Sequence, residues 1–279
     1  MRKSIHEVLI QTYDILSELN KLQQLFFENK IIARRANKMT IENYIDERFF
    51  LWSQSGTCLN LREYMSRIHY ADTQNADLWK DVDADLFSER ALSNLEFYYN
   101  IYKFIGTHIY ADDNLQFELS LYLPIESIIE ALMDQLSVQA VNVGKDKYIV
   151  VSSNDEAVAI AENEFDQSKS VAVLKFNHFK VSGDLEAKRQ ILMKLYHDFD
   201  AGQQREKGTA ADDFCYIMNS ANIRHNNSER NGHSITDGMS PDQIENVYNC
   251  AYRLYLKAKF DIEYMNELKP MVDQYKNPT

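Results

Sequence analysis

The chain has 279 residues, of which 45% are hydrophobic and 12% aromatic, but it contains only 8 Gly and 4 Pro. An all-β protein needs many tight turns, so this scarcity of turn-forming residues argues against that class and favours long helices. The formal net charge of −12 argues against a protein that coats DNA or RNA, because phosphate binding draws on clustered Lys and Arg.

The cysteines and the hydropathy pattern argue against further classes of protein. Cys58, Cys215 and Cys250 are odd in number and widely spaced, which favours neither a disulfide framework nor a cysteine metal site. No apolar run approaches the roughly 18–20 residues of a membrane span. The N-terminus, MRKSIHEVLIQTYDIL, lacks the apolar core of a secretory signal. We therefore expect a soluble, cytoplasmic protein that does not associate with membranes.

The N-terminal region shows a helical pattern. Apolar residues recur at three- and four-residue steps over residues 3–35, which predicts one long amphipathic helix. That segment ends in KIIARRANK, whose cations would complement a helix dipole or, alternatively, contact an anion or RNA. Thr40 is a suitable cap for a second helix, IENYIDERFFLW.

Three further helices are predicted before residue 138. The segments 61–70 and 84–110 carry apolar residues at helical spacing. Pro124 suits the first position of a helix IESIIEALMDQL, where its missing N–H does no harm.

The pattern then changes to that of a β-hairpin. VQAVNV and KYIVVSS are short and rich in β-branched residues, and GKDK connects them, so we expect a hairpin near residues 138–153. An isolated hairpin is marginal, and it must therefore lean on helices. A division near residue 138 would separate a helical region, 1–137, from a hairpin plus helical region, 138–279, although the two could form one continuous domain.

The C-terminal part reads as a series of helices. Asn154 or Asp155 can cap the first, and the ambiguous stretch 170–179 is interpreted as a helix rather than a strand. Helices are also expected over 185–199 and 211–224, and Ser240 followed by Pro241 begins a long helix to about residue 268. The predicted fold class is mainly α, a helical bundle-like architecture with one small hairpin.

Common catalytic signatures are absent from the sequence, which contains no GxGxxG, GxxxxGK, GxSxG or HExxH. His197, Asp198 and Asp200 could supply part of a metal site, but such a site needs further ligands, and polar residues are expected at a helix end. His178 sits in an apolar context that favours a satisfied core histidine. We expect no metal and no cofactor.

One polar cluster stands out: NIRHNN, residues 222–227. Arg224 can bind a phosphate bidentately, and His225 titrates near neutrality and can move a proton. Asn226 and Asn227 add hydrogen-bond donors. This combination makes the stretch a candidate catalytic and anion-binding site.

A second group follows in the same polar segment, where His233 lies close to Arg230. An Arg with a His is the minimum that metal-independent RNA cleavage requires: a proton carrier, and a cation for charge that develops on the phosphate. The candidate catalytic residues are therefore Arg224, His225 and His233, and Arg230 joins the candidate anion-binding residues. The alternative is a helix cap, because Asn favours left-handed turns and Arg and His can satisfy the last free carbonyls.

This polar Arg/His motif between two C-terminal helices resembles the HEPN group of prokaryotic defence and toxin proteins, over roughly residues 185–268. The resemblance implies a metal-independent endoribonuclease that acts as a dimer, with Arg224 and His225 matching the start of the family motif. The match departs after that: positions 229–231 are Glu, Arg and Asn, and His233 lies farther from Arg224 than the family spacing. The chain also resembles uncharacterised bacterial proteins that share an NIRHNN-type stretch.

Because the family spacing fails and the chain is acidic, the sequence favours a non-catalytic interaction or structural module. The alternatives are an HEPN-like endoribonuclease in a toxin or phage-defence role, and a binder of a small anionic ligand. A homodimer or a protein partner fits the first interpretation. RNA would be a partner only under the endoribonuclease alternative, and no DNA is expected.

Overall fold

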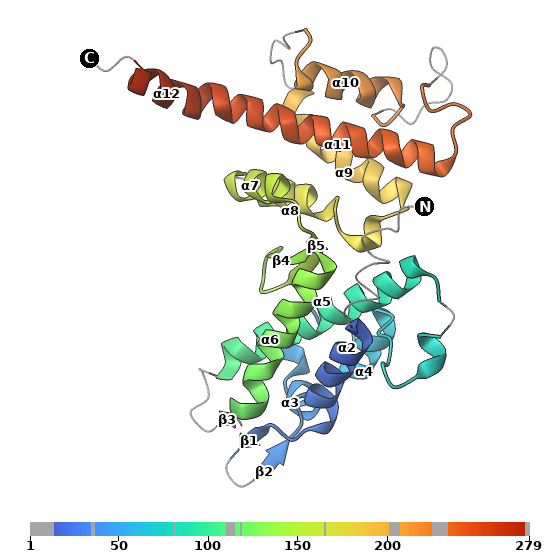
Figure 1. Cartoon of the computed structure of the whole chain (residues 1–279), viewed down its shortest axis with the longest axis vertical. Coiled ribbons are helices and arrows are strands. Elements are labelled where there is room, and N and C mark those ends of the chain that lie inside the picture. Colours follow the sequence, from blue (N-terminus) through green and yellow to red (C-terminus); the bar gives the residue numbers. More distant parts are fainter. Residues whose placement is uncertain are drawn as a thin grey trace. The chain divides into compact units, whose positions relative to one another are not determined.

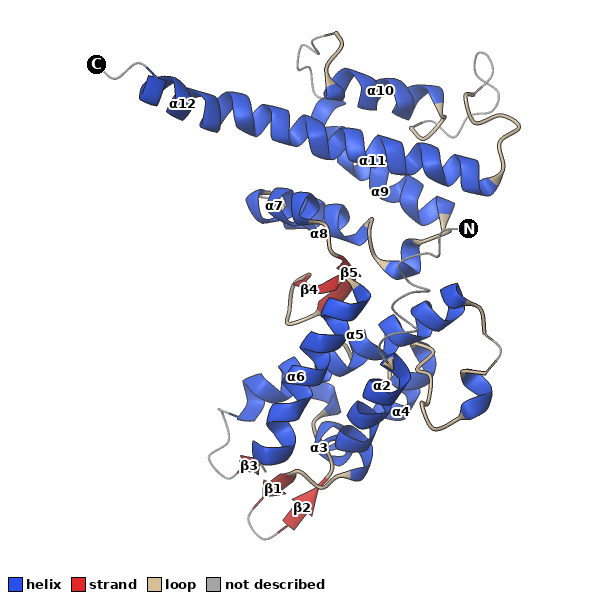
Figure 2. Cartoon of the chain, viewed as in Figure 1, coloured by secondary structure: helices blue, strands red, loops and turns tan. Residues whose placement is uncertain are grey.

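A computed structural model describes residues 14–34, 37–80, 82–109, 115–117, 119–164, 166–200, 207–224 and 234–276. These residues form two compact units, one up to Ser153 and one from Asn154 onward. Helices dominate both units (Figures 1 and 2), which confirms the predicted mainly α fold class. None of the described helices is both long and apolar enough to cross a membrane.

The first unit contains helices and two small antiparallel sheets. In chain order its elements are α2 (Ile15–Gln23), the π-turn η1 (Gln24–Glu28), β1 (Ile32–Arg34), β2 (Asn37–Met39), α3 (Ile41–Glu47), η2 (Phe49–Leu51), α4 (Leu61–Arg67), η3 (Ala76–Leu78), α5 (Ala84–Ile109), β3 (Leu115–Phe117), α6 (Leu119–Leu136), β4 (Val138–Asn142) and β5 (Tyr148–Ser152).

The predicted long N-terminal helix is wrong beyond Glu28. Asn29 takes an extended conformation, and the chain then forms a hairpin in which Ile32 pairs with Met39. Strand β3 pairs with the other side of β1, so the sheet order is β2-β1-β3. Ile31 and Ile32 are both buried, and two consecutive buried β-branched residues suit a strand better than a one-sided helix. The start of the predicted helix, residues 3–13, lies outside the described residues.

Two other local predictions have opposite outcomes. Thr40 caps α3 as predicted, because its hydroxyl accepts a hydrogen bond from the Asn43 N–H at 3.2 Å. In contrast, α6 begins at Leu119, so the prediction that Pro124 opens this helix is wrong. Pro124 is exposed on α6, where water can hydrate the carbonyl that loses its helical partner.

The β4–β5 hairpin is confirmed, with register from Val138↔Ser152 to Asn142↔Tyr148. It leans on α5 through two polar side chains. The Asn100 amide donates to the Tyr148 carbonyl and accepts from the Tyr148 N–H, both at 2.8 Å, and the Glu96 carboxylate accepts from the Val150 N–H at 2.8 Å. Helix α5 thus supplies the hydrogen bonds that a third strand would make. The hairpin belongs to the first unit, and a division near residue 138 stays a prediction.

The second unit is entirely helical within its described residues. Its elements are α7 (Asp155–Asn163), α8 (Gln167–Lys175), the 3-10 turn η4 (Phe179–Val181), α9 (Leu185–Asp200), α10 (Ala210–Ser220), α11 (Pro241–Glu263), the π-turn η5 (Tyr264–Leu268) and α12 (Lys269–Lys276). Because α11, η5 and α12 follow one another without a break, we call residues 241–276 the C-terminal rod.

The start signals predicted for this unit are confirmed. The Asn154 side chain accepts from the Ala157 N–H, and Ser240 forms a capping box with Gln243 ahead of Pro241. The stretch interpreted as a helix over 170–179 begins in α8 and ends at Lys175. The rod continues past the predicted end near 268, to Lys276.

Aromatic side chains join the helices of the second unit. Phe199 of α9, Phe214 of α10 and Tyr255 of α11 meet edge to face, with ring centroids 5.7–5.8 Å apart. Phe176, directly after α8, stacks on Tyr252 of α11 at 4.1 Å. These contacts fix α9, α10 and α11 side by side, and the candidate site lies where α10 ends.

Candidate functional site

Of the six candidate site residues, the structure describes Arg224. The other five, His225, Asn226, Asn227, Arg230 and His233, lie outside the described residues. The structure therefore shows Arg224 with its surroundings, and the residues on either side of segment 225–233.

Helix α10 ends at Ser220, four residues before the predicted end, and Asn222 turns the chain. Asn222 has a positive φ of 54°, the left-handed conformation that Asn tolerates at helix ends. The Arg224 N–H then donates to the Met218 carbonyl at 3.1 Å. Ile223, between them, is completely buried. The first part of NIRHNN is thus a helix C-cap, as one of the two interpretations predicted.

The Arg224 side chain is directed at α9. Its Nη1 donates to the Tyr196 hydroxyl at 3.1 Å, and its guanidinium lies 4.9 Å from the centre of the Tyr196 ring. Tyr196 is buried. The cation is therefore held by a hydrogen bond and by the face of an aromatic ring at the same time.

The carbonyl-capping role expected of Arg224 falls in part to a residue that the sequence interpretation missed, Arg189 of α9. Its Nη1 donates to the Ile223 carbonyl at 3.2 Å. Two further nitrogens of Arg189 bind the Glu186 carboxylate, each at 2.8 Å, and these hydrogen bonds lower the pKa of Glu186 to about 2. The three-residue spacing of Glu186 and Arg189 on a predicted helix was the available signal.

The described residues that flank segment 225–233 are bonded to the last turns of α10. The Arg224 N–H bonds to the Met218 carbonyl, as described above. At the other end, the Ile235 N–H and the Ser234 hydroxyl both donate to the Ser220 carbonyl, at 2.9 and 3.2 Å. The described residues on either side of segment 225–233 are therefore both held at the end of α10.

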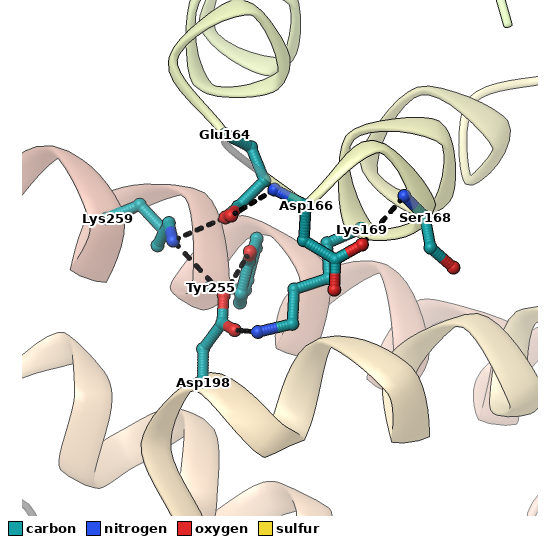
Figure 3. Close-up of polar contacts among 7 residues, drawn as sticks. All are labelled: Glu164, Asp166, Ser168, Lys169, Asp198, Tyr255 and Lys259. Atoms are coloured by element: carbon teal, nitrogen blue, oxygen red, sulfur yellow. Dashed lines mark hydrogen bonds and ion pairs between the residues drawn. The ribbon is translucent and has the colours of Figure 1, made fainter. Parts of the chain in front are cut away.

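A second polar centre lies around Asp198 (Figure 3). One carboxylate oxygen of Asp198 accepts from the Lys169 ammonium, and the other accepts from the Tyr255 hydroxyl at 2.8 Å and from the Lys259 ammonium at 3.1 Å. Lys259 also binds Glu164 at 2.9 Å. We call these five residues the Asp198 network; they come from α8, α9, α11 and the residue that follows α7.

The Asp198 network balances its own charge, with two ammonium groups against two carboxylates. Burial raises the pKa of Asp198, but the hydrogen bonds from Lys169 and Tyr255 and the charge of Lys259 outweigh it, so the net shift is downward. Burial lowers the pKa of Lys259, and Glu164 and Asp198 more than offset this, so its net shift is upward. Asp198 and Lys259 are thus held in their charged forms at neutral pH.

This arrangement gives Asp198 a different chemistry from the metal site considered from the sequence. The lysines and the tyrosine engage both of its oxygens, and His197, its neighbour in sequence, is exposed. No group of three or more metal-ligating side chains occurs among the described residues. Asp198 therefore pairs with two lysine cations and a tyrosine hydroxyl rather than with further metal-ligating side chains.

Lys188 forms a smaller centre at the start of α9. Its buried ammonium donates to Glu245 at 2.7 Å and to Asn249 at 2.8 Å, and it lies 4.9 Å from the centre of the Phe176 ring. Burial raises the pKa of Glu245, but the hydrogen bonds from Lys188 and the Gly183 N–H outweigh it, so the net shift is downward. This ion pair fastens α9 to α11 at the end opposite Asp198.

His178 has the core role that its apolar context predicted. It is buried, and its Nδ1 accepts from the Lys180 N–H at 3.3 Å. Its ring packs against that of Phe179 with centroids 4.4 Å apart. It lies in the turn between α8 and α9, where it caps η4.

Comparison with known protein families, with curated proteins and with solved structures finds no match to this chain. The interpretation of the site therefore rests on its residues and their geometry.

Proposed function

We propose that the C-terminal unit is a non-catalytic helical interaction module, in which Ile223 and Arg224 of NIRHNN join the end of α10 to α9. The observation that carries this proposal is the direction of Arg224. Its guanidinium binds a buried tyrosine of the neighbouring helix, and its backbone N–H closes the end of α10. Both contacts are those of a structural residue.

The other charged groups support the same function. A catalytic acid or base needs a pKa near the working pH and access to substrate. Asp198 and Glu245 instead have lowered pKa values, and each is paired with a lysine. These centres fix helices against one another, and the lowered pKa values keep Asp198 and Glu245 ionised near neutral pH.

The test replaces Arg224 with Ala and uses Arg253→Ala, an exposed position on α11, as the matched control. Loss of a charge-assisted hydrogen bond and of the ring contact should lower the free energy of unfolding by about 1–3 kcal/mol. The control should change it by less than about 0.5 kcal/mol. Urea titrations followed by circular dichroism measure both. Equal stability of the two variants would contradict the structural role.

One observation favours the endoribonuclease alternative. Hydrogen bonds to the Met218 and Ser220 carbonyls hold Arg224 and Ser234, the neighbours in sequence of His225 and His233, at the same end of α10. Purified protein should therefore be incubated with single-stranded RNA in EDTA. The non-catalytic proposal predicts no cleavage, and cleavage that disappears in Arg224→Ala but persists in Arg253→Ala would replace it.

A further inference from the structure

The end of the C-terminal rod carries exposed apolar side chains. From Asp261 to Pro270, and again at Val272 and Asp273, no described side chain is buried. Figure 1 shows α12 extending past α7 and α10 of the same unit. We call the exposed apolar residues of this end the apolar stripe: Ile262 (40% exposed), Tyr264 (49%), Met265 (57%), Leu268 (48%) and Val272 (39%).

The spacing of the apolar stripe is that of a helix–helix seam. Met265, Leu268 and Val272 follow one another at three- and four-residue steps, the pattern by which paired helices bury one face. A contiguous exposed apolar surface bordered by charges marks an interaction site rather than ordinary surface. The stripe therefore needs a partner helix.

The charges beside the stripe indicate which partner. Two ion pairs lie along the rod, Lys257–Asp261 at 3.1 Å and Lys269–Asp273 at 3.2 Å. We call these four residues the charge ladder. They are placed symmetrically about Met265 with opposite signs: Lys257 mirrors Asp273, and Asp261 mirrors Lys269.

The π-helical segment η5 keeps the two halves of the charge ladder, Lys257–Asp261 and Lys269–Asp273, on one side of the rod. Eight residues of regular α-helix overshoot two full turns by about a fifth of a turn. The wider turn of η5, between Asp261 and Lys269, offsets that excess. The two ion pairs therefore lie on the same flank.

We propose that the apolar stripe is a self-association surface, where the rod of a second copy packs antiparallel about Met265. In that alignment Ile262 meets Leu268 of the other copy, and Met265 meets its own equivalent. Each lysine of the ladder meets an aspartate. A parallel pair would place like charges at the same level, so the ladder specifies the antiparallel orientation.

The small area of the apolar stripe makes the expected dimer weak. A stable interface buries about 800 Å² on each partner, and five partly exposed side chains supply less than that. Glu263 and Glu267 also meet as like charges in this alignment. We therefore expect dissociation constants of about 10 μM or weaker, with dimers at high protein concentration.

The experiment exchanges the charges of one half of the ladder at a time. The first half-swap is Lys257→Asp with Asp261→Lys, and the second is Lys269→Asp with Asp273→Lys. Each keeps both ion pairs within the helix, so helix stability is matched. Each places like charges against like in its own dimer, whereas a mixture of the two half-swaps restores every opposite-charge contact between copies.

Sedimentation velocity over a concentration series measures the dimerisation of wild type, of each half-swap and of their mixture. Wild type should dimerise as concentration rises, each half-swap alone should associate roughly tenfold more weakly or not at all, and the equimolar mixture should regain the wild-type behaviour. A wild type that stays monomeric overturns the proposal. So does a dimer that both half-swaps leave unchanged, because its interface then lies elsewhere.

This inference rests on the proposed interaction function, but the two fail separately. The ladder and the stripe contain none of the residues tested for RNA cleavage. Cleavage that depends on Arg224 would remove the proposed function and leave the sedimentation result standing. Monomeric behaviour of all variants would remove the self-association surface and leave Arg224 a structural residue.

Discussion

One continuous helix, the C-terminal rod, has two different environments. At Tyr255 and Lys259 its polar groups bind Asp198 and Glu164, and α7, α9 and α10 pack against it. A turn later, from Ile262 on, its apolar side chains are exposed. The first region buries polar groups only because each is paired, and it holds the unit together. The second exposes apolar groups and can contribute only through a partner.

The largest loss of unfolding free energy is expected when Asp198, at the centre of the first region, is replaced. Asp198→Ala leaves two lysine ammonium groups without their shared carboxylate, and should lower the free energy of unfolding by about 2–4 kcal/mol. Asp261→Ala, in the exposed Lys257 pair, is the control and should cost about 0.5 kcal/mol or less. Chemical denaturation measures both. Similar losses would mean that burial does not distinguish the two regions.

The pH dependence of the unfolding free energy tests the ion pairs of the first region, around Asp198. The folded-state pKa of Asp198 is lowered, so its contribution is present above its unfolded value of about 3.9 and is lost as pH falls through the folded value. Wild type should exceed Asp198→Asn in unfolding free energy by a constant amount above about pH 5. That difference should shrink below about pH 4. A difference that grows on acidification would contradict the assigned charges.

The smallest effect is expected in the second region. Glu267→Gln removes the like-charge contact with Glu263 of a second copy, and should strengthen self-association about two- to threefold. Unfolding free energy should stay within about 0.5 kcal/mol, because Glu267 is exposed. Sedimentation of this variant beside wild type is the measurement: unchanged association would place Glu267 outside the contact, and weaker association would contradict the alignment of Glu267 with Glu263.

The sequence predicted features that depend on a few neighbouring residues. Thr40, Asn154 and Ser240 cap helices as expected, because capping is a contact between residues three apart. The β4–β5 hairpin was equally local. The left-handed turn at Asn222 followed from the tolerance of Asn for that conformation.

Features that depend on distant partners were not predictable. The segment after Glu28 forms a strand that pairs with the nearby β2 and also with β3, more than eighty residues away. Pro124 lies within α6 although the local rule favours a helix start. The partners of Asp198 are 29, 57 and 61 residues away. The residues next to Asp198 in sequence therefore could not show whether it binds lysines or a metal ion. The bond of Arg189 to the Ile223 carbonyl, 34 residues away, could not be predicted for the same reason, although the Glu186–Arg189 spacing was visible in the sequence.

The central claim is that Arg224 acts through Tyr196, and a double-mutant cycle tests it most directly. Arg224→Ala, Tyr196→Phe and the double variant should be compared in unfolding free energy. Tyr196→Phe removes the hydroxyl that accepts from Arg224 and keeps the buried ring. We expect a coupling of about 1 kcal/mol, with the double variant less destabilised than the two single losses together. Additivity within about 0.3 kcal/mol would contradict the claim and leave Arg224 free for another role.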